Sequence, residues 1–125
     1  MQKNEMFGQR IRRLREETGM SLRSFAKMLN RTPTYISKIE RDEFSPPAEE
    51  IVREMARILK QDADDMLILA GRIPADLLAI VMQNPKESTL VLRAIKGFSP
   101  VQMQIFLKVV TAIASDEDAA LKEAA

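Results

Sequence analysis

The chain has 125 residues, of which 46% are apolar and 30% charged, so it suits one ordinary domain, or a domain of about 70 residues with a short helical appendage. It contains no cysteine and no histidine, which excludes disulfides, thiolate catalysis, Cys/His zinc sites and imidazole acid–base chemistry. The net charge of +1 conceals an asymmetry, because residues 1–41 carry +6, residues 42–72 carry −4 and residues 73–125 carry −1. A basic first third fits a nucleic-acid surface, although charge alone fits a solvated helix face equally well.

The chain shows no sign of a membrane or export signal. No apolar run approaches the roughly 20 residues that a membrane span requires, and the start Met1-Gln2-Lys3-Asn4-Glu5 is too polar for a signal peptide. We therefore expect a cytoplasmic protein that has no membrane partner.

Three helices are predicted in the basic third. Apolar residues at three- and four-residue intervals predict a first helix over residues 4–18, which ends at Gly19. Ser21 is a suitable N-cap for a second, short helix, which the turn residues 30–32 end. Thr32 caps a third helix over residues 33–41, with proline at its first position.

The rest of the chain also follows a helical pattern, and no strand alternation is present. We expect helices over residues 48–60 and 62–70, and then three proline-started helices over residues 74–83, 85–96 and 100–114. The predicted fold is all-α. Its expected parts are a five-helix domain over residues 1–72, a helical segment over residues 73–114, and a flexible tail over residues 115–125.

The second and third helices and their turn have the spacing of a helix-turn-helix. Ala26 is the small residue where the two helices cross, Asn30 stands at the turn position that requires a positive φ, and Ile36 locks the third helix onto the second. The stretches Ser21-Leu22-Arg23-Ser24-Phe25-Ala26 and Tyr35-Ile36-Ser37-Lys38-Ile39-Glu40-Arg41 resemble regulators of the lambda repressor/Cro-like (XRE-type) family. The resemblance covers about residues 5–70. It implies a five-helix domain and a dimeric, sequence-specific DNA-binding transcriptional repressor.

The sequence departs from the family pattern at four positions. Leu22 stands where the family usually has Gln, Asn30 and Asp42 stand where it has Gly, and Arg31 stands where it has an apolar residue. Without the Gln donor, phosphate contacts of the second helix rest on Ser21 and on main-chain N–H groups. Arg31 is free to direct its guanidinium toward phosphate.

A B-DNA major groove admits one α-helix, and residues on the exposed N-terminal face of the third helix are placed to reach base edges. The candidate base contacts are Pro33, Thr34, Ser37 and Lys38. By resemblance, Pro33, Thr34 and Lys38 match the base-reading positions of the family. Lys38 suits guanine O6 and N7, with a phosphate contact as its alternative.

The candidate phosphate contacts share a hydroxyl or a cationic group near the two helices, and they are Ser21, Arg23, Lys27, Arg31, Tyr35 and Arg41. For Tyr35 the alternative is half-burial against the second helix. For Arg23, Lys27 and Arg41 it is simple solvated charge. The residues expected to brace the motif are Ala26, Ile36 and an Arg15–Glu40 pair that the resemblance implies, the alternative for the pair being two solvated charges.

The segment after residue 73 holds more apolar surface than three short helices hide among themselves, which indicates a partner. The expected dimer residues are Leu78, Val81, Leu92, Ile95, Phe98, Ile105, Phe106 and Val109. A two-fold dimer suits two half-sites one helical turn apart. Alternatively the stripe packs back on the first domain, or it binds another protein, as in an antitoxin or a partner-controlled regulator.

An enzyme is not expected, nor any cofactor or metal. Asp62, Asp64 and Asp65 form an acidic cluster, but they stand at the start of a predicted helix, where acidic residues favour the helix dipole.

Overall fold

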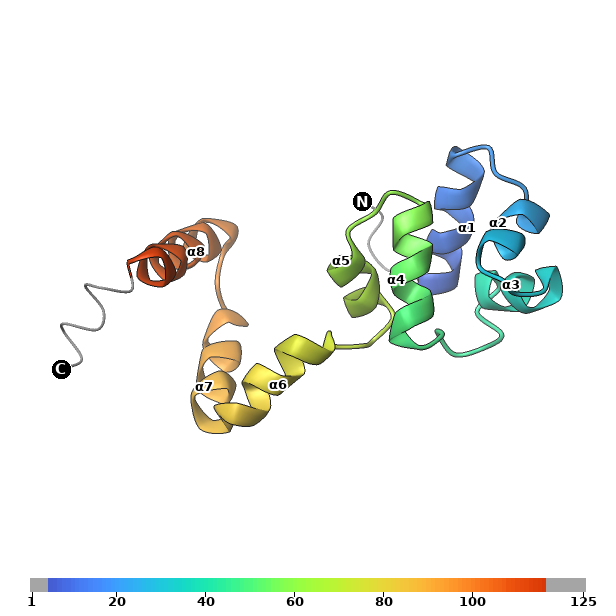
Figure 1. The fold of residues 1–125 in the computed structure, drawn as a ribbon. Helices are drawn as coiled ribbons and strands as arrows, with labels where there is room; N and C mark the ends of the chain where they lie inside the picture. Colours follow the sequence, from blue (N-terminus) through green and yellow to red (C-terminus); the bar gives the residue numbers. More distant parts are fainter. Residues whose placement is uncertain (1–4, 117–125) are drawn as a thin grey trace. The chain divides into compact units, whose positions relative to one another are not determined.

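The structure is a computed structural model that describes residues 5–116. Its helices are α1 (Phe7–Glu17), α2 (Leu22–Met28), α3 (Pro33–Glu40), α4 (Glu49–Ile58), α5 (Ala63–Leu69), α6 (Ala75–Gln83), α7 (Pro85–Ile95) and α8 (Pro100–Ser115). Throughout residues 5–116 every regular element is a helix, which confirms the predicted all-α class (Figure 1). The chain divides into two units, Met1–Ala79 and Ile80–Ala125, and each is described by itself.

Each of the helices α1 to α5 contributes side chains to the core of the first unit. Helices α1 and α2 pack on α3, and α4 packs on α5. The fully enclosed side chains include Ile11, Phe25, Ile36, Val52 and Leu67, one from each helix. These residues lie at the apolar helical spacing read from the sequence, so burial of one stripe per helix explains the bundle.

Helices α1 to α5 all end in the same way. The residue after each C-cap has a positive φ, and these residues are Gly19, Asn30, Asp42, Lys60 and Gly71. In each case the next N–H donates to the carbonyl five residues back, as Glu43 does to Lys38 at 3.0 Å and Gln61 does to Ala56 at 2.8 Å. This is the Schellman arrangement, which satisfies carbonyls that the helix end leaves unpaired. The positive φ predicted at Asn30 is confirmed, with a value of 54°.

Helix α1 begins at Phe7, so the prediction of a start at residue 4 was wrong, although residue 4 itself lies outside the described residues. Met6 is extended, and the Gln9 side chain accepts a hydrogen bond from its N–H at 3.2 Å. Glu5 is turned back onto the helix, where Arg13 and Arg10 bind its carboxylate. The hydrogen bond from Arg13 is the main cause that lowers the pKa of Glu5.

Gly8 allows α1 to approach the end of α3 closely. A Cβ built at Gly8 would lie 2.0 Å from the carbonyl oxygen of Ile39, so no larger residue fits unless the backbone moves. The Gly8 N–H donates to Asp42 Oδ1 at 2.8 Å, and Asp42 thereby satisfies one of the free N–H groups of the first turn.

The compact first unit continues to Ala79, past the predicted domain end at residue 72. Arg72 donates through Nε to the Pro47 carbonyl at 2.7 Å and through Nη2 to the Pro46 carbonyl at 2.9 Å. Pro74 is fully buried, and the Ala75 N–H donates to Glu49 at 3.2 Å. These contacts fix the start of α6 on the loop before α4. At the other end of the chain, Ser115 still belongs to α8, and residues 117–125 of the predicted tail lie outside the described residues.

Lys60 offers a direct test of the helix-end geometry. A non-glycine residue in the left-handed region is strained by roughly 1–2 kcal/mol. Glycine removes this strain, but its greater conformational freedom in the unfolded chain offsets part of the gain in stability. Lys60→Gly is therefore expected to stabilise the protein by about 0.5–1 kcal/mol, a rise of a few degrees in Tm. Thermal unfolding followed by circular dichroism measures this. Lys60→Ala, which removes the same side chain and keeps the Cβ, serves as the control and should give no gain; an equal gain would assign the effect to the lysine side chain.

Candidate nucleic-acid interface

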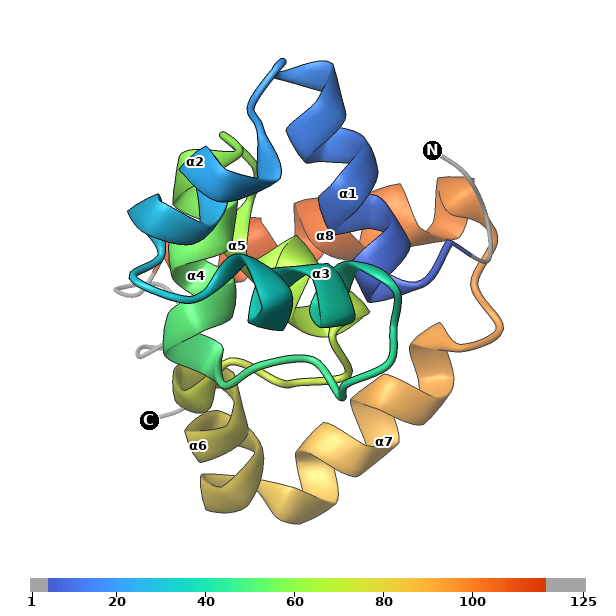
Figure 2. The same cartoon turned by 90° about the vertical axis from the view of Figure 1, so that its right-hand side faces the viewer.

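Helices α2 and α3 are set by capping residues that the sequence identified. Ser21 Oγ accepts a hydrogen bond from the Ser24 N–H, and Thr32 Oγ1 accepts one from the Tyr35 N–H, each at 3.1 Å. Ala26 and Ile36 are completely buried where the two helices meet. The result is a short helix, a turn at residues 29–32 and a second helix whose outer face is uncovered; in Figure 2, α3 crosses the front of the first unit.

A buried ion pair holds α3 against α1. Arg15 donates through Nε to Glu40 Oε2 at 2.8 Å and through Nη2 to Oε1 at 3.0 Å, so the two groups meet in parallel. The third nitrogen of the Arg15 guanidinium donates to the Met20 carbonyl at 2.9 Å. The hydrogen bonds with Glu40 are the main cause that raises the pKa of Arg15. The pair expected from the sequence is thus a buried contact rather than two solvated charges.

The four candidate base contacts lie on the uncovered face of α3. Pro33 and Thr34, in its first turn, are exposed, whereas Ser37 and Lys38, one turn later, are half-buried. Lys38 Nζ lies 5.2 Å from the centroid of the Phe44 ring. The Lys38 ammonium therefore lies against the face of the Phe44 ring.

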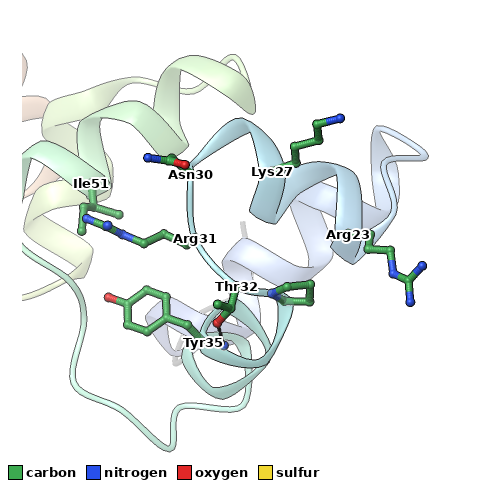
Figure 3. Close-up of a pocket in the computed structure, with 8 residues that line it drawn as sticks. Arg23, Lys27, Asn30, Arg31, Thr32, Tyr35 and Ile51 are labelled. Carbon is green, nitrogen blue, oxygen red and sulfur yellow. Dashed lines mark hydrogen bonds between the residues drawn. The ribbon is translucent and has the colours of Figure 1, made fainter.

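A hollow of about 880 Å³ opens beside this face. It is lined by Arg23 and Lys27 of α2, Asn30, Arg31 and Thr32 of the turn, Pro33 and Tyr35 of α3, and Ile51 of α4. In Figure 3, the Arg31 guanidinium and the Tyr35 hydroxyl point toward the side of Ile51, while Arg23 and Lys27 extend from α2. Four candidate phosphate contacts are therefore gathered around one depression, which is open to a large ligand.

The charge around the hollow is not compensated, in contrast to that of α1. The arginines of α1 are paired with carboxylates, Arg10 and Arg13 with Glu5, Arg12 with Glu16 and Arg15 with Glu40. Within residues 5–116, Arg23, Lys27, Arg31 and Lys38 have no carboxylate within salt-bridge distance. The positive potential of the first unit is therefore concentrated on α2, the turn and α3, where a polyanion would meet it.

Two candidate phosphate contacts make other contacts in the structure. Tyr35 is half-buried, with its ring 6.0 Å from that of Phe44, and its hydroxyl still reaches the hollow (Figure 3). Arg41 pairs with Glu43 at 3.2 Å and donates to the Ser37 carbonyl at 3.3 Å. Because both side chains of the Arg41–Glu43 pair are half exposed, a phosphate can displace the carboxylate at little cost.

Comparison with known proteins identifies the motif. A family model described as a helix-turn-helix domain matches residues 6–67. The structure of SinR, a master regulator for biofilm formation, in complex with DNA is 31% identical over 50% of this chain and 98% of that chain, with a TM-score of 0.46. The chain belongs to the helix-turn-helix family. The resemblance to Cro/repressor-type regulators expected from the sequence is confirmed.

Two further solved structures are similar to about half of the chain. The N-terminal DNA binding domain of SinR from Bacillus subtilis is 31% identical over 50% of this chain and 90% of that chain, with a TM-score of 0.46. ClgR, a clp gene regulator from Corynebacterium glutamicum, is 28% identical over 52% and 83%, with a TM-score of 0.45. No curated protein matches the sequence. The chain thus contains a helix-turn-helix domain and is similar in sequence to SinR and ClgR.

Sequence reasoning missed Phe44 in this helix-turn-helix unit. Its ring contacts both Tyr35 and Lys38, but it stands in the loop after α3, outside any periodic pattern. The available signal was the departure at Asp42, where the family usually has glycine. Asp42 adopts a φ of 57° and binds Gly8, and this fixes the loop that carries Phe44.

Seven of the eight predicted dimer residues lie on α6, α7 and α8, in which no residue is buried within the described part, and Phe98 lies in the loop between α7 and α8. Val81 and Leu92 line one shallow apolar hollow between α6 and α7. A second hollow is lined by Phe98, Ile105, Phe106 and Val109, and the rings of Phe98 and Phe106 meet edge to face at 5.8 Å. Leu78 is exposed on α6, and Ile95 is half-buried on α7. The structure thus gathers six of the eight residues at two hollows.

The described part of the chain offers no group of three His, Cys, Asp or Glu residues placed to hold a metal. Among its helices, none combines the length and the apolar character needed to cross a membrane.

Removal of Glu40 tests the bracing pair. Glu40→Ala leaves the Arg15 guanidinium buried and without its partner, which typically costs roughly 3–5 kcal/mol. Urea unfolding should show a loss of about that size. The control is Glu43→Ala, which removes an exposed partner of Arg41 and should cost at most about 1 kcal/mol. If the two variants lose equally little stability, the Arg15–Glu40 pair does not brace the motif.

Proposed function

We propose that this regulator binds duplex DNA sequence-specifically as a homodimer, with the N-terminal face of α3 in the major groove, and that it acts as a repressor. The observation that supports the proposal is the uncompensated positive charge on Arg23, Lys27 and Arg31, which surrounds the hollow beside that face. Attraction to phosphate supplies most of the affinity that is independent of sequence. The groove width admits one helix, and the N-terminal turn of α3 is exposed.

Base recognition is assigned to Pro33, Thr34, Ser37 and Lys38. Lys38 is the strongest candidate, because its ammonium donates well to guanine O6 and N7. Thr34 and Ser37 have hydroxyls that accept or donate, and Pro33 makes apolar contact only. Because Pro33 and Thr34 lie in the exposed first turn, we expect them to enter the groove most deeply.

Phosphate contacts are assigned to the residues around the α3 face. Arg23, Lys27, Arg31 and Tyr35 meet at the hollow, and Ser21 lies at the N-terminus of α2, where free N–H groups attract an anion. Arg41 joins them when a phosphate replaces Glu43 as its partner. These contacts orient the protein on the duplex and carry no sequence information themselves.

We expect repression because the bound dimer covers a stretch of DNA that other proteins then cannot contact. A dimer that contacts two half-sites occupies about one helical turn between their centres, and another protein cannot use the same groove surface. Transcription in vitro from a promoter that contains the selected site should therefore fall as the protein is added. An increase would assign activation instead.

The second unit supplies the surface for a homodimer. Leu92, Ile105 and Val109 are more than half exposed, and a soluble protein rarely leaves such apolar side chains together in contact with water. A two-fold interface uses the same surface of each copy and sets two α3 helices at one spacing.

A second candidate function places a different protein on this surface. The observation that favours it is the pair of separate apolar hollows, one between α6 and α7 and one on the segment from Phe98 to Val109, each of which suits a side chain of a partner. In that case the bound partner controls whether the regulator is free to bind DNA.

The experiment that tests DNA recognition is selection from a pool of random duplexes at two salt concentrations. The expected result is an enriched palindrome with half-sites about one turn apart and a steep fall of affinity with salt. Lys38→Ala should lose about 1–3 kcal/mol on the selected site and relax the preference at one base pair, whereas uniform weakening assigns Lys38 to phosphate. No duplex retained above background at low salt would overturn the proposal.

Ile105→Glu tests the homodimer by analytical ultracentrifugation of the full chain. Because Ile105 is exposed in the protomer, the charge should leave folding intact and weaken self-association by about tenfold or more. Gln104→Glu, which adds the same charge at the neighbouring exposed position, is the control and should remain dimeric. A wild-type protein that stays monomeric at high concentration contradicts the homodimer and favours the second candidate.

A further inference from the structure

Phe44 makes a contact with Lys38 that DNA recognition by α3 does not by itself require. The Lys38 ammonium lies 5.2 Å from the centroid of the Phe44 ring, within the range of a cation–π interaction. Lys38 is half-buried, whereas Pro33 and Thr34 on the same helix face are exposed. A loop residue therefore holds the side chain with the greatest capacity to read a base.

The backbone before Phe44 is fixed at two places. Asp42 and Glu43 donate their N–H groups to the carbonyls of Ile39 and Lys38, each at 3.0 Å, which closes the end of α3. The Asp42 carboxylate accepts the Gly8 N–H at 2.8 Å and so ties the same turn to α1. Phe44 follows directly, so its position relative to Lys38 is set by the main chain and does not depend on a flexible loop.

The Phe44 ring is also supported from α3. Tyr35 lies one turn before Lys38, and its ring packs against that of Phe44 with centroids 6.0 Å apart and planes tilted by 47°. Aromatic pairs in this arrangement attract each other beyond their apolar burial. Phe44 therefore contacts two consecutive turns of the helix face that is proposed to enter the groove.

The ring orients Lys38 without neutralising it. Of the two carboxylates in the same loop, that of Asp42 accepts the Gly8 N–H and that of Glu43 pairs with Arg41 at 3.2 Å, and within the described residues Lys38 has no acidic partner. A carboxylate would compete with DNA for the ammonium. An aromatic face leaves the charge in place and occupies one side of the group, so N–H donors remain for an acceptor opposite the ring.

We propose that Phe44 is a positioning residue that aims Lys38 at one base pair of the operator and so sets the sequence preference there. A free lysine side chain has many rotamers and loses that freedom on binding. The ring restricts Lys38 before DNA arrives, which lowers the entropic cost for the one base that fits its direction. The inference rests on the proposed DNA binding and adds a specificity determinant outside α3.

The test is a double-mutant cycle that combines Phe44 and Lys38 variants of the full chain. Binding is measured to two duplexes, the selected operator and the same operator changed at the base pair where Lys38→Ala relaxes the preference. Phe44→Leu keeps an apolar side chain and removes the ring. It should bind the operator about 2–5-fold more weakly, as expected from a partly exposed cation–π contact, and bind the changed duplex as the wild type does. Phe44→Tyr should restore the preference. In a Lys38→Ala background, Phe44→Leu should have no further effect.

Three results would overturn the proposal. These are an equal loss on both duplexes, a loss that persists in the Lys38→Ala background, and tighter binding by Phe44→Leu, which would mean that the ring sequesters the ammonium. Thermal unfolding of each variant shows whether a loss of binding comes from a loss of stability. Because Phe44 is 44% exposed, Phe44→Leu should have the same Tm as the wild type. A wild-type protein that retains no duplex refutes the proposed function itself, whereas a wild-type protein that binds alongside an unaffected Phe44→Leu refutes only the role of Phe44.

Discussion

The buried pair of Arg15 and Glu40 is the constraint on which the outward face of α3 depends. One guanidinium joins α1 to the end of α3 through two parallel hydrogen bonds, and its third nitrogen binds the Met20 carbonyl just before α2 begins. One planar guanidinium thus links α1 to the end of α3 and to the residue two positions before α2. Apolar packing alone tolerates small rotations of a helix, but a buried charge tolerates little displacement of its partner. The orientation of α3, and with it the set of side chains turned outward, follows from this geometry.

The distribution of acidic residues has as much influence on the surface as that of basic ones. Carboxylates lie along or fold back on α1, where Glu5, Glu16 and Glu17 pair with its arginines. Helix α2 and the turn that follows it contain no acidic residue, so their cations stay available. A count of charge along the sequence shows only an excess of +6 in residues 1–41. The pairing in three dimensions reduces that broad basic region to one face.

Local chemistry made much of this fold predictable, and long-range contacts limited the rest. Caps such as Ser21 and Thr32, proline at helix starts and the positive φ of Asn30 act within a few residues, and the structure contains each of them. The predicted start of α1 was wrong because Glu5 lies outside the helix and binds Arg13 and Arg10 from there. The close approach at Gly8 and the contact of Phe44 with Lys38 join segments that no periodicity relates. The base and phosphate assignments, the dimer surface and the domain boundaries stay predictions, because they concern partners that the chain alone does not contain.

The loop between α3 and α4 is held at several points along its length, in contrast to most surface connections. Asp42 is bound to α1, Phe44 lies against α3, and the carbonyls of Pro46 and Pro47 accept hydrogen bonds from Arg72 beyond α5. Exposed surface loops that lack such attachments usually accept insertions freely. Here one added residue would break the register between these attachments, so related sequences that share them should keep the length of this loop constant.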